Sequence, residues 1–125
     1  MNEIISTERA PAAVGPYSQA VKSGNLLFCS GQIALDPASG NLVGKDIKTQ
    51  TEQVMQNISA VLAAAGSDFG NAVKTTCFLA DINDFAEFNF VYGQYFTGKP
   101  ARSCVAVSAL PKGALIEVEV VAVCK

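Results

Sequence analysis

Three charged side chains lie among apolar neighbours and could act on a small anionic molecule. Arg102 stands in the run 101–107, whose other residues are small or apolar, and Glu117 and Glu119 stand in the strand-like run 115–124. A guanidinium there needs a partner, because an unpaired buried charge costs several kcal/mol. The partner is either Glu117 or Glu119 on a neighbouring strand, or a carboxylate brought by a ligand, which Arg grips with two parallel hydrogen bonds.

Glu117 and Glu119 are expected to project to the same face of their strand. A carboxylate among aliphatic side chains titrates unusually and is a candidate general base, and a structural salt bridge is an equally good reading of the same pattern. These residues therefore predict a protein that binds a small carboxylate, with acid–base catalysis as one possibility.

The composition excludes several other chemistries. With no histidine, the chain has no Ser-His or Cys-His nucleophile pair and no imidazole metal ligand. Nine basic and eleven acidic residues give a net charge of −2, with no basic run to track phosphates, so nucleic acid is not expected as a partner. Residues 93–99 match the first seven positions of a phosphate-binding P-loop, but Pro100 stands where Ser or Thr must hold magnesium.

The cysteines are scattered and contain no Cys-x-x-Cys pair, which favours free thiols and no metal site. Cys104 lies close to Arg102, whose charge could lower the thiol pKa; a wall position in a pocket is favoured over a nucleophilic role. The N-terminus has no signal-peptide pattern, and no apolar stretch is long enough to span a bilayer. We expect a cytoplasmic protein with no membrane partner.

Hydrophobic periodicity predicts the elements that position these residues. The pattern indicates strands, helix, strand, helix and strands, without a repeat or a linker. In order, the predicted elements are a hairpin within 17–33 turning at 23–25, a helix from Ile47 to Gly66 with 49–52 as a capping box, a strand at 72–80, a helix opened by Asp84 and closed by Gly98, and strands at 101–109 and 115–124 joined by a turn at 111–113.

This order predicts a single α+β domain, residues 1–125, with a sheet of mixed pairing and two helices packed on one face. The final strand is apolar on both faces in its second half, which a sheet with one solvated face does not need. Charged residues make up 16% of the chain, where about a quarter is usual. A partner subunit covering the second face explains both observations, so we expect a homo-oligomer.

At this level of detail the sequence resembles the RidA/YjgF family of enamine/imine deaminases over its full length. The matching segments are Gly15–Ala20, Ser30–Ile33, Val73–Thr76, Ile82–Phe85, Asn89, Pro100–Val105 and Ile116–Glu119. The resemblance implies a chorismate-mutase-like subunit in a homotrimer, with the trimer core on the second face of the sheet and three sites in the clefts between subunits. It implies a 2-iminobutanoate/2-iminopropanoate deaminase, which hydrolyses reactive imino and enamine acids released by pyridoxal-phosphate enzymes, such as 2-aminoacrylate, to 2-keto acids and ammonia. It implies no cofactor and no metal.

Carried over by position, the resemblance implies that Arg102 holds the substrate carboxylate and Glu117 positions or activates water. Cys104 would line the site, where its backbone helps to orient the substrate. The wall would be completed by Tyr17, Ser30, Gly31 and Asn89. An iminium carbon is already electrophilic, so water adds to it without metal, covalent nucleophile or histidine.

The sequence departs from the family pattern in one place, and two functions other than deamination are alternatives. Between Phe96 and Arg102 the chain has only five residues, where relatives usually carry a few more, so one rim of the cleft is expected to be more open. The main alternative function is a non-catalytic regulatory protein that binds a small keto acid. Inhibition of translation by RNA cleavage, also attached to the family, is disfavoured by the acidic composition.

Overall fold

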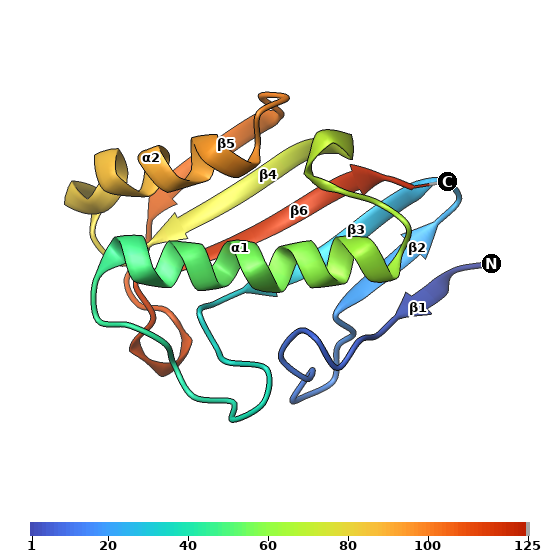
Figure 1. Cartoon of the computed structure of the whole chain (residues 1–125), viewed down its shortest axis with the longest axis horizontal. Helices are drawn as coiled ribbons and strands as arrows, with labels where there is room; N and C mark the ends of the chain where they lie inside the picture. The colour runs from blue at the N-terminus through green and yellow to red at the C-terminus, as the bar shows by residue number, and fades with distance from the viewer. Residues whose placement is uncertain (125) are drawn as a thin grey trace.

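The computed structural model describes residues 1–124 as six strands and two α-helices (Figure 1). Three short 3-10 turns, at Phe69–Asn71, Ile82–Asp84 and Pro111–Gly113, join some of them. The elements are β1 (Glu3–Ile5), β2 (Ala20–Ser23), β3 (Leu26–Gln32), α1 (Ile47–Ala64), β4 (Ala72–Leu79), α2 (Phe85–Tyr95), β5 (Ala101–Ala106) and β6 (Ile116–Val123).

The strands form one mixed sheet in the order β1-β2-β3-β6-β4-β5. All neighbours are antiparallel except β4 and β5, which run parallel because α2 crosses over between them. The predicted hairpin is confirmed as β2 and β3, which turn at Gly24 with a positive φ of 62°. The sequence analysis expected the strand of Arg102, β5, to lie next to the strand of Glu117, β6. This expectation is wrong, because β4 lies between them and pairs with β5 on one edge and with β6 on the other.

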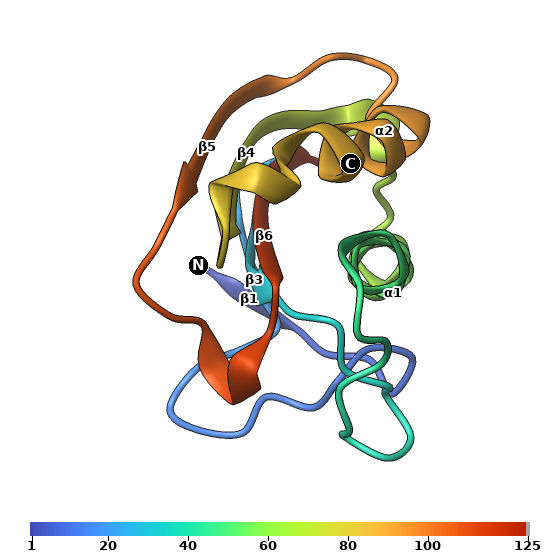
Figure 2. The same ribbon diagram turned by 90° about the vertical axis from the view of Figure 1, so that its left-hand side faces the viewer.

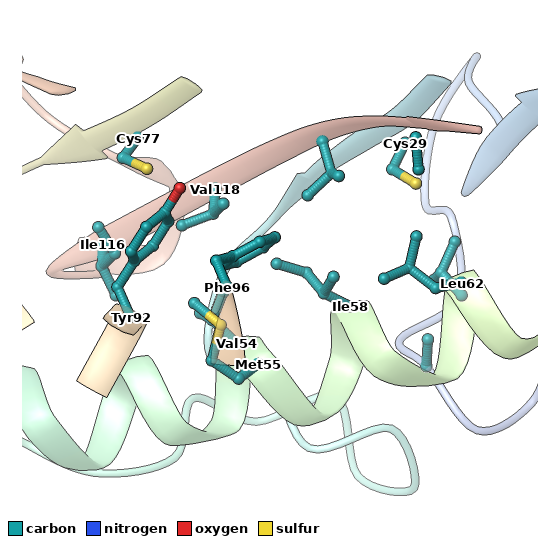
Figure 3. Packing of buried hydrophobic residues seen from close by; sticks show 14 of the residues in the cluster. Cys29, Val54, Met55, Ile58, Leu62, Cys77, Tyr92, Phe96, Ile116 and Val118 are labelled. Atoms are coloured by element: carbon teal, nitrogen blue, oxygen red, sulfur yellow. The ribbon is translucent and has the colours of Figure 1, made fainter. Parts of the chain in front are cut away.

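Both helices cover the same face of the sheet, as predicted, and the core lies between them and the strands (Figure 2). On β6 the buried residues alternate, from Ile116 and Val118 to Val120, and pack toward α1. Figure 3 shows Met55 and Ile58 of α1 facing this row. The apolar side chains at every second position of β6 therefore pack against those at helical spacing on α1, and together they form one apolar layer.

Helix α1 begins at Ile47 and ends before Gly66, and α2 follows Asp84, as predicted, but two predicted caps are wrong. The amide of Gln50 donates to the Asp46 carbonyl at 3.1 Å, so helical bonding starts from Asp46, and Thr49 lies inside α1 rather than capping it. Asp46 makes no side-chain cap hydrogen bond. Helix α2 ends at Tyr95 with Phe96 as its C-cap, so Gly98 is not the cap that was expected. Strand β1 was not predicted, because three residues on a sheet edge carry no readable period.

The face of the sheet away from the helices exposes apolar side chains. Phe28 is 47% exposed and Val105 is 46% exposed, and both stand on this open face, where Phe28 lies opposite Val121 of β6. Exposed apolar side chains gathered on a sheet face mark an interaction surface. The cover predicted from the sequence, a second subunit, stays a prediction.

Candidate functional site

One side of α2 holds the Arg102 side chain on the face of the sheet that the two helices cover. Strand pairing sets Arg102 opposite the buried Thr75 of β4, so both side chains point toward the helices. The Arg102 Nη1 donates to Asn89 Oδ1 at 2.7 Å, and the guanidinium carbon lies 4.8 Å from the centre of the Tyr92 ring and 5.5 Å from that of Phe85. Phe85, Asn89 and Tyr92 follow helical spacing, and together they fix the direction of the guanidinium.

Tyr92 connects this arrangement to the core. Its hydroxyl shares a hydrogen bond of 2.7 Å with Thr75 Oγ1, and both side chains are buried. Figure 3 shows the Tyr92 hydroxyl pointing toward the sheet. The hydrophobic periodicity that predicts this helix gave no sign that the Tyr92 ring supports Arg102.

Arg102 has no carboxylate partner in the part of the chain that the structure describes. Among residues 1–124 its polar contact is with the neutral Asn89, so the alternative that paired it with Glu117 or Glu119 is wrong. The remaining guanidinium donors face a cavity of about 380 Å³ beside the C-terminal half of α2. Its lining is Asn89, Tyr92, Gly93, Phe96, Thr97, Lys99, Pro100 and Arg102. A planar set of free donors in a cavity suits a ligand carboxylate.

Cys104 lies two residues further along β5, beside the buried Cys77 of β4. Burial raises the pKa of the Cys104 thiol, and the opposing influence of the Arg102 charge does not overcome it. The thiol is therefore protonated at neutral pH, which disfavours a nucleophilic thiolate and favours a wall position.

Glu117 occupies the opposite face of the sheet. Its neighbours along β6, Ile116 and Val118, are fully buried toward the helices, so the Glu117 side chain points to the open face. It is half-buried and has no hydrogen-bond or ion-pair partner among residues 1–124. Burial and, second, the nearby Glu119 raise the pKa of Glu117, which suits a group that takes and returns a proton.

Gly31 provides the space that Glu117 occupies. A Cβ atom at position 31 would stand 2.8 Å from Glu117 Cδ and 2.9 Å from Cγ. Gly31 lies where the pairing of β3 with β6 shifts register between Cys29 and Gln32. The absence of a side chain there is thus required for the position of the carboxylate, and not for an unusual backbone angle.

Glu117 and Gly31 line a second cavity, of about 370 Å³. Its lining is Pro11, Ala12, Val14, Tyr17, Gln19, Gly31, Gln32, Ile33, Leu35, Pro111, Lys112 and Glu117. Tyr17 is 54% exposed at this cavity, as a binding residue can be. Ser30 lies beside Gly31, but its hydroxyl donates to the Ser18 carbonyl at 2.6 Å and so braces the wall.

Gln19 is a site residue that sequence reasoning missed. Its buried side-chain amide donates to the Pro11 carbonyl at 2.7 Å and to the Thr7 carbonyl at 3.0 Å, and its Oε1 accepts from the Thr7 amide at 2.7 Å. These bonds fix the segment 7–11, whose last residue, Pro11, lines the Glu117 cavity together with Gln19. The only signal in the sequence is a polar amide next to the strand residue Ala20.

The predicted site residues therefore form two groups on opposite faces of one sheet. Arg102, Asn89 and Cys104 lie on the helix side, and Glu117 and Gly31 lie on the open side with Tyr17 and Ser30. Arg102 and Glu117 line two different cavities. We call these groups the arginine half-site and the glutamate half-site.

The described residues were compared with the arrangements that hold metal ions and with the helices that cross membranes. Within residues 1–124, no three His, Cys, Asp or Glu side chains are arranged to hold a metal ion. Over the same residues, neither helix combines the length and the apolar content needed to cross a bilayer.

Comparison with known proteins identifies the family. Residues 7–124 match the model of the family described as endoribonuclease L-PSP. A bovine protein named 2-iminobutanoate/2-iminopropanoate deaminase is 52% identical over 124 residues, 98% of this chain and 90% of its own length. AldR of Lactococcus lactis, named as a candidate regulator, is 55% identical over 121 residues, 96% of each chain.

A solved structure of Escherichia coli TdcF with bound serine superposes with a TM-score of 0.93 at 42% identity, covering 98% of this chain and 99% of that one. The chain belongs to the RidA/YjgF family, whose model is the L-PSP one.

Replacing Gly31 tests the packing behind Glu117. Gly31→Ala should lower the free energy of unfolding by about 1–3 kcal/mol, because the new methyl group overlaps the Glu117 side chain. In a Glu117→Ala background the same change should cost much less, which urea unfolding of the four proteins of the cycle measures. An equal cost in both backgrounds would show that Glu117 is not what Gly31 accommodates.

Glu117 should also make stability depend on pH. Because its pKa is raised in the folded state, the native protein holds a proton that the unfolded chain releases, so this contribution is present below the ordinary carboxyl pKa and is lost as pH rises through the raised value. Glu117→Gln should therefore stabilise the protein more at pH 7 than at pH 4 in urea unfolding. A gain that is independent of pH would contradict the raised pKa.

Proposed function

We propose that the protein is a 2-imino acid deaminase whose active site forms between two copies of the chain, with the arginine half-site of one facing the glutamate half-site of the next. The observation that carries the proposal is that, among residues 1–124, Arg102 has no carboxylate partner and the Glu117 side chain has no hydrogen-bond or ion-pair partner. Each group is suited to one end of an imino acid. Three copies around an axis, a homotrimer, would repeat the junction and close the ring.

Arg102 would bind the substrate carboxylate. The Asn89 hydrogen bond and the Tyr92 ring leave the outer edge of the guanidinium free for two parallel hydrogen bonds. Holding the carboxylate places the C=N carbon at a fixed distance from the facing subunit, and such positioning is a large part of what a reaction with water needs.

Glu117 would handle the protons. Its carboxylate accepts a proton from water as the water oxygen bonds to the iminium carbon, forming a carbinolamine. The same carboxyl then returns that proton to the nitrogen. The C–N bond breaks as the carbinolamine hydroxyl gives its proton to the Glu117 carboxylate, so that the carbonyl forms and ammonia leaves; Glu117 then passes this last proton to the departing ammonia. One iminium and one water are consumed, and one 2-keto acid and one ammonium are produced. A carboxyl whose pKa is raised by burial and by the nearby Glu119 is suited to both transfers, because its carboxylate is a stronger proton acceptor than an ordinary one and its acid form can still return the proton.

A binding function is the second candidate. The E. coli TdcF structure holds serine, and the L. lactis relative carries the name of a regulator, which favours a cleft that senses a small amino or keto acid. Arg102 alone would serve the binding of a keto acid, whereas an unpartnered, half-buried Glu117 with a raised pKa favours a reaction that transfers protons. RNA cleavage, which the family description names, has no support in a chain of pI about 5.0.

The activity is tested by coupling a threonine dehydratase to the protein and following 2-oxobutanoate while semicarbazide traps free imine. The wild-type protein should accelerate ketone formation. Arg102→Ala should lower kcat/KM about 100-fold, and Arg102→Lys should recover part of it, since lysine keeps the charge but not the two parallel bonds. Glu117→Gln should lower kcat at least 100-fold. The activity of the wild type should fall as pH drops through the raised Glu117 pKa. A wild type no faster than buffer would overturn the enzyme and leave the binding function.

The assembly is tested on the open face. Phe28→Glu should convert the homotrimer to a smaller species in sedimentation velocity at micromolar concentration, because it places a charge where the sheets would pack. Phe90→Glu is the matched control, since Phe90 is 63% exposed on α2 and lies on the helix side. A wild type that sediments as a monomer contradicts the proposal.

A further inference from the structure

We infer that Lys99 is a second substrate-binding cation of the arginine half-site, and that the site accepts 2-imino acids whose side chain ends in a second carboxylate. The inference rests on the proposed function, since it names a substrate class for that site. It concerns the short segment between α2 and β5, residues 97–100.

Lys99 and Arg102 line the same cavity. The cavity of about 380 Å³ lies between the end of α2 and the start of β5, and both cations are part of its wall. The rest of its lining is neutral, from Asn89 and Thr97 to the rings of Tyr92 and Phe96, and includes no Asp or Glu. A concave surface with two positive charges and no negative one favours a ligand with two negative charges.

Neither cation is neutralised by a carboxylate of the described residues. Among residues 1–124, no carboxylate lies within ion-pair distance of the Lys99 or the Arg102 side chain. A substrate with one carboxylate pairs with Arg102 and leaves Lys99 without an anion. A second carboxylate supplies that anion in the same cavity.

The backbone at Lys99 is held in an uncommon conformation. Its φ is 54°, in the left-handed region that glycine adopts at least cost, although Gly98 is the preceding residue and does not take it. The Lys99 amide donates to the Phe96 carbonyl at 3.2 Å and closes a turn directly after α2. Strained residues of this kind cluster where a side chain must be directed to a site.

The spacing fits a dicarboxylic acid of moderate length. Three residues span at most about 10 Å between the Cα atoms of Lys99 and Arg102, and both side chains are long enough to reach inward from that span. The carboxyl carbons of a five-carbon dicarboxylic imino acid lie about 5 Å apart when extended. The two cations can therefore bind the two ends of one substrate, with the C=N carbon next to the Arg102 end.

The test compares two substrates with wild type, Lys99→Gln and a control. A glutamate oxidase generates the dicarboxylic imine in the presence of catalase, and threonine dehydratase generates 2-iminobutanoate, with semicarbazide as the competing trap in both. The wild type should hydrolyse both imines. Lys99→Gln should raise KM about five- to tenfold for the dicarboxylic imine and leave kcat/KM for 2-iminobutanoate within about twofold. Lys45→Gln, a loss of the same charge outside both cavities, should change neither.

The dependence of activity on ionic strength is a second measurement, and it would not differ between the two proteins if Lys99 had only a structural role. The advantage of the wild type over Lys99→Gln on the dicarboxylic imine should shrink as salt rises, because an exposed cation is screened. Calorimetry with the keto-acid products makes the same comparison without turnover. Lys99→Gln should weaken the binding of 2-oxoglutarate and leave that of 2-oxobutanoate unchanged.

The outcomes separate this inference from the proposed function. A wild type that hydrolyses 2-iminobutanoate but not the dicarboxylic imine, or a Lys99→Gln variant that affects both substrates equally, overturns the role of Lys99 and leaves the deaminase standing. A wild type inactive on both imines overturns the deaminase. In that case the role of Lys99 is decided by calorimetry, where equal binding of 2-oxoglutarate to both proteins overturns it.

Discussion

Successive side chains of a β-strand point to opposite faces of the sheet, and in this protein the buried helix face leaves the strands no freedom to slip. Ile116, Val118 and Val120 are buried against the helices, so Glu117 must point the other way. Thr75 is buried beneath α2, so its neighbour Arg102 must share the helix side. The two groups that the proposed reaction needs are thereby held apart in one chain and can meet only across a junction between chains.

The uncompensated charges of each half-site agree with a site that a bound substrate and a second subunit complete. Glu117 is half-buried with another carboxylate nearby, which raises its pKa, and nothing cationic in the described chain relieves it. Arg102 keeps a neutral partner in Asn89 and two aromatic rings, which orient the guanidinium without neutralising it. Lys99 adds a further charge to the same cavity. These are costs to folding that a bound substrate and a second subunit would offset.

Much of the fold could be predicted from the sequence, because the helix over residues 47–64 and the strands of the hairpin carry clear periods. The order of the strands in the sheet could not be predicted. The short connection between β5 and β6 suggests that these two strands are neighbours, whereas β4 lies between them in the sheet. Charged residues in apolar runs pointed to Arg102 and Glu117, and the resemblance to a family added their roles and Gly31, but neither gave the face of the sheet on which each side chain lies. Contacts between distant segments, such as Tyr92 beneath Arg102 and Gln19 on Pro11, leave no local pattern and were found only in the structure.

A complementation experiment tests the division of the site between chains most directly. Arg102→Ala and Glu117→Gln are each expected to be inactive, and equal amounts are unfolded together and refolded as mixed assemblies. In a cyclic assembly a junction is intact when one chain keeps Arg102 and the next keeps Glu117, which random mixing produces at about one junction in four. The account predicts about a quarter of wild-type deaminase activity after joint refolding, and none when the two variants are refolded separately. Joint refolding that recovers no activity would contradict it.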